Sequence, residues 1–167
     1  TADITGKTLT VSGAEVTDKV YDGNTAATVT GAVLVGVIGP DDVSLANETA
    51  GTFAQADAGF DIAVTTAMTL TGADKDAYLL EQPSGLTADI SALAVAVSAR
   101  AGSKVAGSGE PEFAYDVAPA LLGGDTFSGQ LQREAGEEPG EYDILLGNLS
   151  AGANYTVTYT GAKFTIL

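Results

Sequence analysis

The sequence contains no cysteine, no histidine and no tryptophan. Without cysteine the chain has no disulfide, no thiolate nucleophile and no cysteine-ligated metal site. Without histidine it has no Ser–His or Cys–His pair, and it lacks the side chain that most often transfers protons near neutral pH. An enzyme built on this chain would have to work with carboxylates, lysine, tyrosine or hydroxyl groups alone. We therefore expect no catalytic residues and no enzymatic activity.

Basic residues are also scarce. Seven Lys and Arg residues stand against 22 Asp and Glu residues, which gives a formal net charge of −15 and a pI near 4.1. Nucleic acids are bound mainly through Lys and Arg contacts to phosphate, so this surface repels them and we expect no nucleic-acid partner. We interpret the acidity as a solvated, self-repelling surface, although carboxylates also attract divalent cations.

Long hydrophobic runs are missing. The longest nearly apolar segment covers residues 32–38, whereas a membrane-spanning helix needs roughly 20 apolar residues. We therefore expect no membrane insertion. The first residues do not form the charged and then apolar pattern of a signal peptide. Since the chain begins like the inside of an array of modules, as argued below, this says nothing about where the full protein is located.

The 167 residues are 45% hydrophobic, mostly Ala, Val and Leu, which is enough to form a core. Two small modules fit the length, because the tetrapeptide TADI occurs at 1–4 and again at 87–90. When the two halves are aligned from these points, four blocks match in the same order, and the copies end at Ile90 and Ile166. We therefore predict a first module at 1–90 and a second at 91–167, with residues 1–5 resembling the end strand of a preceding module.

Within each block hydrophobic residues alternate with polar or small ones, which is the period of a half-buried strand. Gly, Pro, Asp and Asn separate these runs at close spacing, as in turns. The pattern predicts an all-β chain of two tandem small modules, each a β-sandwich or a β-grasp-like sheet. Each module has at most one short helix, for which the candidate positions are 118–122 and 35–38. The joint at 90–93 has no flexible linker, so we expect the modules to be arranged end to end.

The segments KVYDGNTAATVTG, VIGPDDVSL and LTGADKDAYLL resemble the YDG domain of large bacterial surface adhesins. The segments PALLGGDTFSGQLQREAGEEPGEYDI and LSAGANYTVTYTGAKFTI resemble the MBG domain that follows it in such proteins. The chain departs from the MBG pattern at Ala106, where that family usually has a tyrosine. The residues that carry the two family motifs are Tyr21, Asp22, Gly23, Gly124, Asp125 and Tyr155.

The resemblance implies a repeated extracellular module of filamentous, haemagglutinin-like or biofilm adhesins, exported by a dedicated pathway and without catalytic activity. At the Tyr21-Asp22-Gly23 motif, Tyr21 either stacks on a ligand or packs its ring over the strand that follows, and a turn in which Asp22 bonds to its own backbone is our preferred interpretation.

The loops hold candidate ligands for Ca²⁺, which prefers carboxylate oxygens. These candidates are Asp41, Asp42, Asp74 and Asp76, the last two spaced as D-x-D. Since the chain lacks the remaining acidic positions of a calcium loop, we prefer to interpret these residues as turn caps. A second acidic cluster is interpreted as the solvated end of a hairpin; its members are Glu134, Glu137, Glu138 and Glu141.

Two functions follow from these features. The first is a stalk or spacer repeat of a bacterial secreted or cell-surface adhesin, whose partners are the neighbouring modules of the same chain. The alternative is a module of the same adhesin that binds Ca²⁺ or a host or matrix carbohydrate. We expect no other cofactor.

Overall fold

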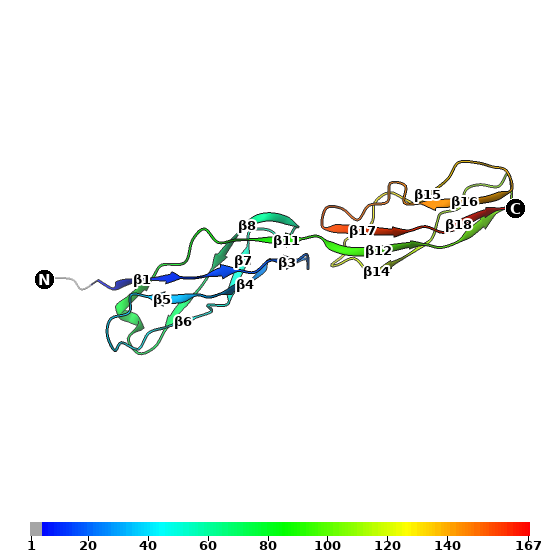
Figure 1. The fold of residues 1–167 in the computed structure, drawn as a ribbon. Coiled ribbons are helices and arrows are strands. Elements are labelled where there is room, and N and C mark those ends of the chain that lie inside the picture. The colour runs from blue at the N-terminus through cyan, green and yellow to red at the C-terminus, as the bar shows by residue number, and fades with distance from the viewer. Residues whose placement is uncertain (1–4) are drawn as a thin grey trace. The chain divides into compact units, whose positions relative to one another are not determined.

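A computed structural model describes residues 5–167. The expectation that residues 1–5 are the end strand of a preceding module falls almost wholly on residues 1–4, which lie outside the described part. The chain divides into two compact units between Ser91 and Ala92 (Figure 1). We call the unit up to Ser91 the first module and the unit Ala92–Leu167 the second module.

The first module is built from short strands and a single turn of 3₁₀ helix within its described residues. Its elements in chain order are β1 (Lys7–Ser12), β2 (Glu15–Val16), β3 (Lys19–Val20), β4 (Ala26–Thr30), β5 (Val33–Val35), β6 (Ser44–Ala46), β7 (Ala50–Phe53), β8 (Gly59–Thr66), β9 (Thr69–Thr71), η1 (Lys75–Ala77), β10 (Tyr78–Leu80) and β11 (Thr87–Ser91). Those of the second module are β12 (Leu93–Ala99), β13 (Gly102–Lys104), β14 (Tyr115–Ala118), β15 (Gln132–Arg133), β16 (Gly140–Leu145), β17 (Tyr155–Thr160) and β18 (Lys163–Ile166). The all-β prediction is confirmed.

The two modules share one topology. In the first, β1 lies between β10, which is parallel to it, and β5, which is antiparallel; in the second, β12 lies in the same way between β17 and β14. Next, β11 lies between parallel β3 and antiparallel β8, and β18 lies between β13 and β16. The repeat in the sequence is therefore a repeat of strand order and direction.

The modules differ at one edge of the larger sheet, and within the described residues only the first module has a further two-stranded sheet, β6-β9. The larger sheet of the first module has the order β2-β4-β7-β8-β11-β3, whereas the matching sheet of the second has the order β13-β18-β16-β15. Strand β15 corresponds to β7, because each pairs antiparallel with the strand that follows it. Within the described residues the second module has no strand that corresponds to β4 or β2.

The alternation of hydrophobic with small or polar residues along the strands determines which side chains form the core. In β12, Val95 and Val97 are buried while Ala94 and Ala96 face solvent. Val97 meets residues of the other sheet in one hydrophobic cluster, among them Ile144 of β16 and Phe164 of β18. Two sheets therefore close on a shared core. The second module thus has the two packed sheets of a β-sandwich, and among residues 5–167 no helix covers a sheet in the way a β-grasp requires.

In each module the chain enters at one end and leaves at the opposite end (Figure 1). In the second module β12 is followed by β13, and their parallel partners β17 and β18 also follow one another, with only two residues between them. The first strand of the module and its last strand therefore run in the same direction.

The predicted positions of the short helix were wrong. Residues 35–38 are the end of β5 and the start of a turn, and residues 118–122 begin with the end of β14 and Pro119, a residue that disfavours helical geometry in the one before it. The only helical turn in the described residues is Lys75–Ala77, where the Ala77 N–H donates to the Asp74 carbonyl at 3.1 Å.

Candidate functional site

A buried tyrosine holds a turn in the first module. Tyr78 begins β10 and is 6% exposed. Its hydroxyl donates a hydrogen bond to the Asp41 carboxylate at 2.5 Å and accepts one from the Ile38 N–H at 3.0 Å. The Asp41 N–H in turn donates to the Ile38 carbonyl at 3.1 Å. The tyrosine hydroxyl thus contacts both ends of one turn, and we call this arrangement a tyrosine lock.

The second module has the same lock at the matching place. Tyr155 begins β17, and its hydroxyl donates to Asp125 at 2.7 Å and accepts from the Leu122 N–H at 2.9 Å. The Asp125 N–H donates to the Leu122 carbonyl at 2.8 Å. Between them, Gly123 and Gly124 have φ of +59° and +103°, which only glycine adopts at little cost. Three of the predicted motif residues, Gly124, Asp125 and Tyr155, therefore form one local structure.

The locks make these hydroxyl groups poor acids. The hydrogen bond to the Asp41 carboxylate raises the pKa of Tyr78, and burial, followed by the hydrogen bond to Asp125, raises the pKa of Tyr155. A tyrosine that transfers protons near neutral pH would need the opposite shift. The geometry supports a structural role for both side chains.

The Tyr21-Asp22-Gly23 motif forms a turn at the end of β3. Asp22 accepts the Asn24 N–H at 3.1 Å and the Lys19 ammonium at 2.7 Å, and the bond to Lys19 lowers the pKa of Asp22. Gly23 has φ of +76°. Tyr21 is 8% exposed, so its ring packs against the module rather than standing open to a ligand.

The four candidate calcium ligands each have a donor within the protein. Asp41 belongs to the lock of Tyr78. Asp42 accepts the Ala73 N–H at 3.2 Å, and Asp74 accepts the Asp42 N–H at 2.9 Å, so these two carboxylates cap facing turns. Asp76 accepts from Lys75 at 2.6 Å. In the described residues no three acidic side chains gather as a metal site would require.

A network of four charged side chains lies in the second module, and the sequence did not predict it. The Lys104 side chain is 5% exposed, and its ammonium contacts Glu110 at 2.9 Å and Glu137 at 2.8 Å. The Arg133 side chain is 7% exposed; it binds both oxygens of Glu110, at 2.7 and 2.9 Å, and Glu137 at 2.7 Å. Glu137 is therefore one of the four members of an ion-pair network, and the interpretation of its cluster as a solvated hairpin end was incomplete.

Arg133 takes the place that a core phenylalanine has in the first module. Arg133 pairs with Ile144 in the second module as Phe53 pairs with Val64 in the first. The guanidinium lies 5.7 Å from the centre of the Phe164 ring, at a distance at which a cation and an aromatic face attract each other. The network thus keeps a cation over the core while its charge is balanced by two carboxylates.

Electrostatics around the network hold Glu110 ionised. The hydrogen bonds from Arg133, and then those from Lys104, lower the pKa of Glu110 from 4.5 to about 2. In the sequence the only signal was the repeated Lys-Val pair, which places Lys19 and Lys104 at matching positions of β3 and β13. Lys19 lies 5.4 Å from the Phe53 ring. Lys104 binds Glu137, which Arg133 also binds. Since Arg133 matches Phe53, each lysine lies close to the same position of its own module.

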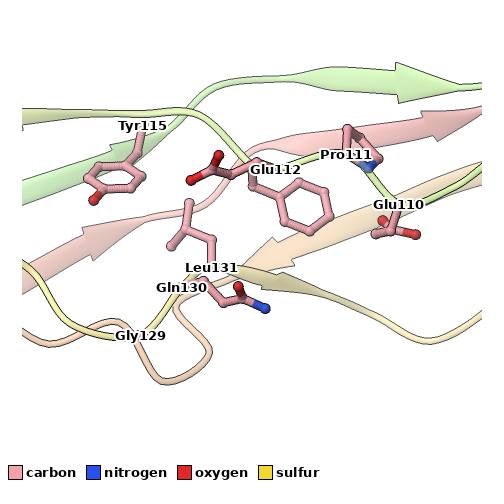
Figure 2. A pocket seen from close by; sticks show the side chains of 8 residues that line it. Glu110, Pro111, Glu112, Tyr115, Gly129, Gln130 and Leu131 are labelled. Atoms are coloured by element: carbon pink, nitrogen blue, oxygen red, sulfur yellow. The ribbon is translucent and has the colours of Figure 1, made fainter.

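A groove lies beside this network in the second module. It consists of two adjoining cavities of about 360 and 370 Å³. Figure 2 shows one of them between the chain at 110–115 and the chain at 129–131, with Leu131 between the two segments and Glu112 pointing toward Tyr115. The residues shared by both cavities are Glu110, Phe113, Gln130 and Leu131. None of the predicted site residues lines it.

Comparison with family models identifies both halves of the chain. A YDG domain model matches residues 5–88, half of the chain, and a model of the MBG domain (YGX type) matches residues 95–165. The chain therefore belongs to the YDG domain family and carries an MBG domain directly after the YDG domain. Neither the curated proteins nor the solved structures contained a match. YDG and MBG domains are found in adhesin-like proteins.

A search of the helices in the described residues found none with the length and hydrophobicity of a membrane span.

Proposed function

We propose that the chain is a pair of structural repeats in the stalk of a bacterial secreted or cell-surface adhesin, where the modules act as extracellular spacers without catalysis. The observation that carries this proposal is the shared topology, in which each module takes the chain in at one end and passes it out at the other. Modules of this kind extend a chain when they are repeated. The match to two domain families found in adhesin-like proteins supports the same function.

The arrangement of the terminal strands suits tension along the chain. The first strand of the second module, β12, pairs in parallel with β17 over six residue pairs, from Leu93↔Tyr155 to Ser98↔Thr160. Strand β17 is connected to the last strand, β18, by two residues. A pull at the two ends of the module therefore slides β12 against β17 and stretches all of these hydrogen bonds together, whereas a pull across the strands would break them one at a time.

The polar side chains of the predicted motifs are occupied within the modules. The lock hydroxyls of Tyr78 and Tyr155 each make two hydrogen bonds, and Asp22 is held by Lys19 and Asn24. In the described residues no buried side-chain polar atom lacks a hydrogen-bond partner. Since the side chains of the motif residues hold turns in place, they support the proposal that these modules have a structural role.

The proposal is tested in the parent protein by deleting these 167 residues in frame. We expect antibodies against the two modules to label intact cells that carry the undeleted protein. We also expect the deletion to leave ligand binding by the rest of the adhesin intact while it weakens adhesion between cell and surface, since the binding part is held closer to the cell. Loss of ligand binding by the purified deletion protein would contradict a spacer role.

A further inference from the structure

The groove of the second module lies where the first module has strand β4. Strand β7 pairs with β8 on one side and with β4 on the other, in the register Ala26↔Thr52 to Thr28↔Ala50. Its counterpart β15 pairs with β16 and ends its sheet. The groove borders this free edge, since its lining includes Leu131, Gln132 and Arg133. The second module thus has a cavity at the position of a strand.

The backbone of β15 presents the same donor as β7. In the first module the Phe53 N–H donates to the Thr25 carbonyl at the start of β4, at 2.8 Å. The matching residue is Arg133. The next amide, that of Glu134, donates to Asp143 in the direction of β16 at 3.0 Å. Because successive amides of a strand point to opposite sides, the Arg133 N–H is directed toward the groove.

The chain that could have supplied this strand lies on the far side of the groove. Between β13 and β14 the residues 105–114 form no strand, whereas the matching stretch of the first module contains β4. Glu110 is fixed there by its bonds to Arg133 and Lys104. Figure 2 shows the two segments lying apart, with the side chain of Leu131 between them.

The lining of the groove defines the chemistry of an occupant. Phe113 is half-buried and Leu131 is 3% exposed, so the floor is apolar. Exposed acidic side chains stand at the rim, namely Glu112 and Glu134. The two cations near the groove, Lys104 and Arg133, are already paired with carboxylates. An extended segment with small apolar side chains toward the floor and basic side chains toward the rim complements this surface.

We propose that the second module binds such a basic, extended peptide segment along β15, where it is added to the sheet in the position that β4 occupies in the first module. Strand addition of this kind supplies affinity through main-chain hydrogen bonds and specificity through alternate side chains. In β4, Ala27 and Val29 are buried while Ala26, Thr28 and Thr30 are exposed, which is the alternation that a strand in this position would have. This binding activity goes beyond a spacer role and does not rest on it.

The test uses the whole 167-residue chain and a capped peptide of sequence Thr-Lys-Ala-Thr-Val-Lys-Gly, which keeps Ala27 and Val29 of β4 and has lysine in place of the exposed Ala26 and Thr30. We expect saturable binding in calorimetry and slower hydrogen exchange of the Arg133 amide when the peptide is bound. The substitution Glu112→Lys should weaken binding roughly two- to fivefold, as expected for one exposed ion pair. The matched substitution Glu48→Lys, at an exposed position of the first module, should leave the affinity unchanged.

A second peptide separates strand addition from attraction by charge alone. It has the same residues but carries N-methyl groups on alternate backbone amides, which prevents ladder hydrogen bonds while the charge is kept. We expect this peptide to lose binding. Equal binding of the two peptides would overturn the proposal, as would the absence of any response to the first. It would equally be overturned if a neutral oligosaccharide, but neither peptide, perturbed the amides of residues 130–134.

Discussion

The hydroxyl of Tyr155 donates a 2.7 Å hydrogen bond to the carboxylate of Asp125, 30 residues earlier in the chain. The same relationship joins Tyr78 and Asp41 in the first module, over 37 residues. In both cases the tyrosine begins the strand that pairs in parallel with the first strand of its module. In each module this hydrogen bond therefore connects the parallel strand pair, β1–β10 or β12–β17, to a turn that comes earlier in the chain.

Substitution of this tyrosine tests the lock. Tyr155→Phe keeps the ring but removes the hydroxyl, so the Leu122 N–H loses its acceptor and the Asp125 carboxylate loses this donor. We expect the free energy of unfolding of the second module to fall by about 1–3 kcal/mol. Urea unfolding followed by NMR signals of each module measures this change, and the first module should be unaffected.

Tyr142→Phe is the matched control, because that hydroxyl donates to the Glu138 carbonyl at an exposed site. Its effect should stay within about 0.5 kcal/mol. If both substitutions destabilised the second module equally, the lock would have no special role.

Replacing either of two glycines of the second module by alanine should lower its stability, but by different amounts. A Cβ atom at Gly129 would lie 2.2 Å from the Asn148 carbonyl oxygen, and φ there is +74°, whereas Gly124 has φ of +103° with no atom within 4 Å. Gly124→Ala should cost about 1–3 kcal/mol from backbone strain alone. Gly129→Ala should cost distinctly more, since the clash is with backbone. Thermal melts of the two variants measure the difference, and equal melting temperatures would contradict the turn geometry.

The ion-pair network predicts a dependence of stability on pH. Since the pKa of Glu110 is about 2 in the folded chain and 4.5 without its partners, the unfolded state binds more protons between these values. The contribution of Glu110 is therefore complete above pH 4.5 and is lost as the pH falls toward 2. The pKa of Glu137 is lowered as well, first by Lys104 and then by Arg133, and it acts in the same direction.

The measurement compares the free energy of unfolding of wild type and Glu110→Gln from pH 7 to pH 2. We expect the difference between them to be constant above pH 5 and to shrink below it. The comparison removes the general gain in stability that protonation brings to a chain of net charge −15. Curves that stay parallel down to pH 2 would mean that Glu110 is not held by Arg133 and Lys104.

Calcium is expected to leave the melting temperature unchanged. The carboxylates of Asp42 and Asp74 are engaged in capping each other's turns, and Asp41 and Asp76 have their own donors. A ligand that binds only the folded state raises its apparent stability, so melts with millimolar Ca²⁺ and with a chelator detect a site. Coincident melts agree with turn caps, and a clear rise with Ca²⁺ would restore the alternative of a calcium-binding module.

The sequence predicted the architecture because both of its signals are local or periodic. The alternation at 93–99 corresponds to strand β12, and the order of the four repeated blocks corresponds to the topology that the modules share. The tyrosine locks could not be predicted, since each joins residues 30 or more positions apart and Asp41 resembles any other turn aspartate.

The groove was equally hidden in the sequence. Phe113, Tyr115 and Val117 alternate as a strand would, yet β14 begins only at Tyr115. The residues before it are fixed elsewhere by the bonds from Arg133 to Glu110. Nothing in the local pattern of 105–114 distinguishes a segment that joins a sheet from one that leaves its edge free. The burial of Lys104 and Arg133 depends on the same long-range pairing.

Force spectroscopy on the whole chain, held at its two ends, tests most directly whether the modules are built to carry tension. We expect two separate unfolding events, each lengthening the chain by about 0.35 nm per residue released. The first module should unfold at the lower force, since β1 and β10 share three residue pairs and β12 and β17 share six. Extension without a resolved barrier, or unfolding of the second module before the first, would contradict the account.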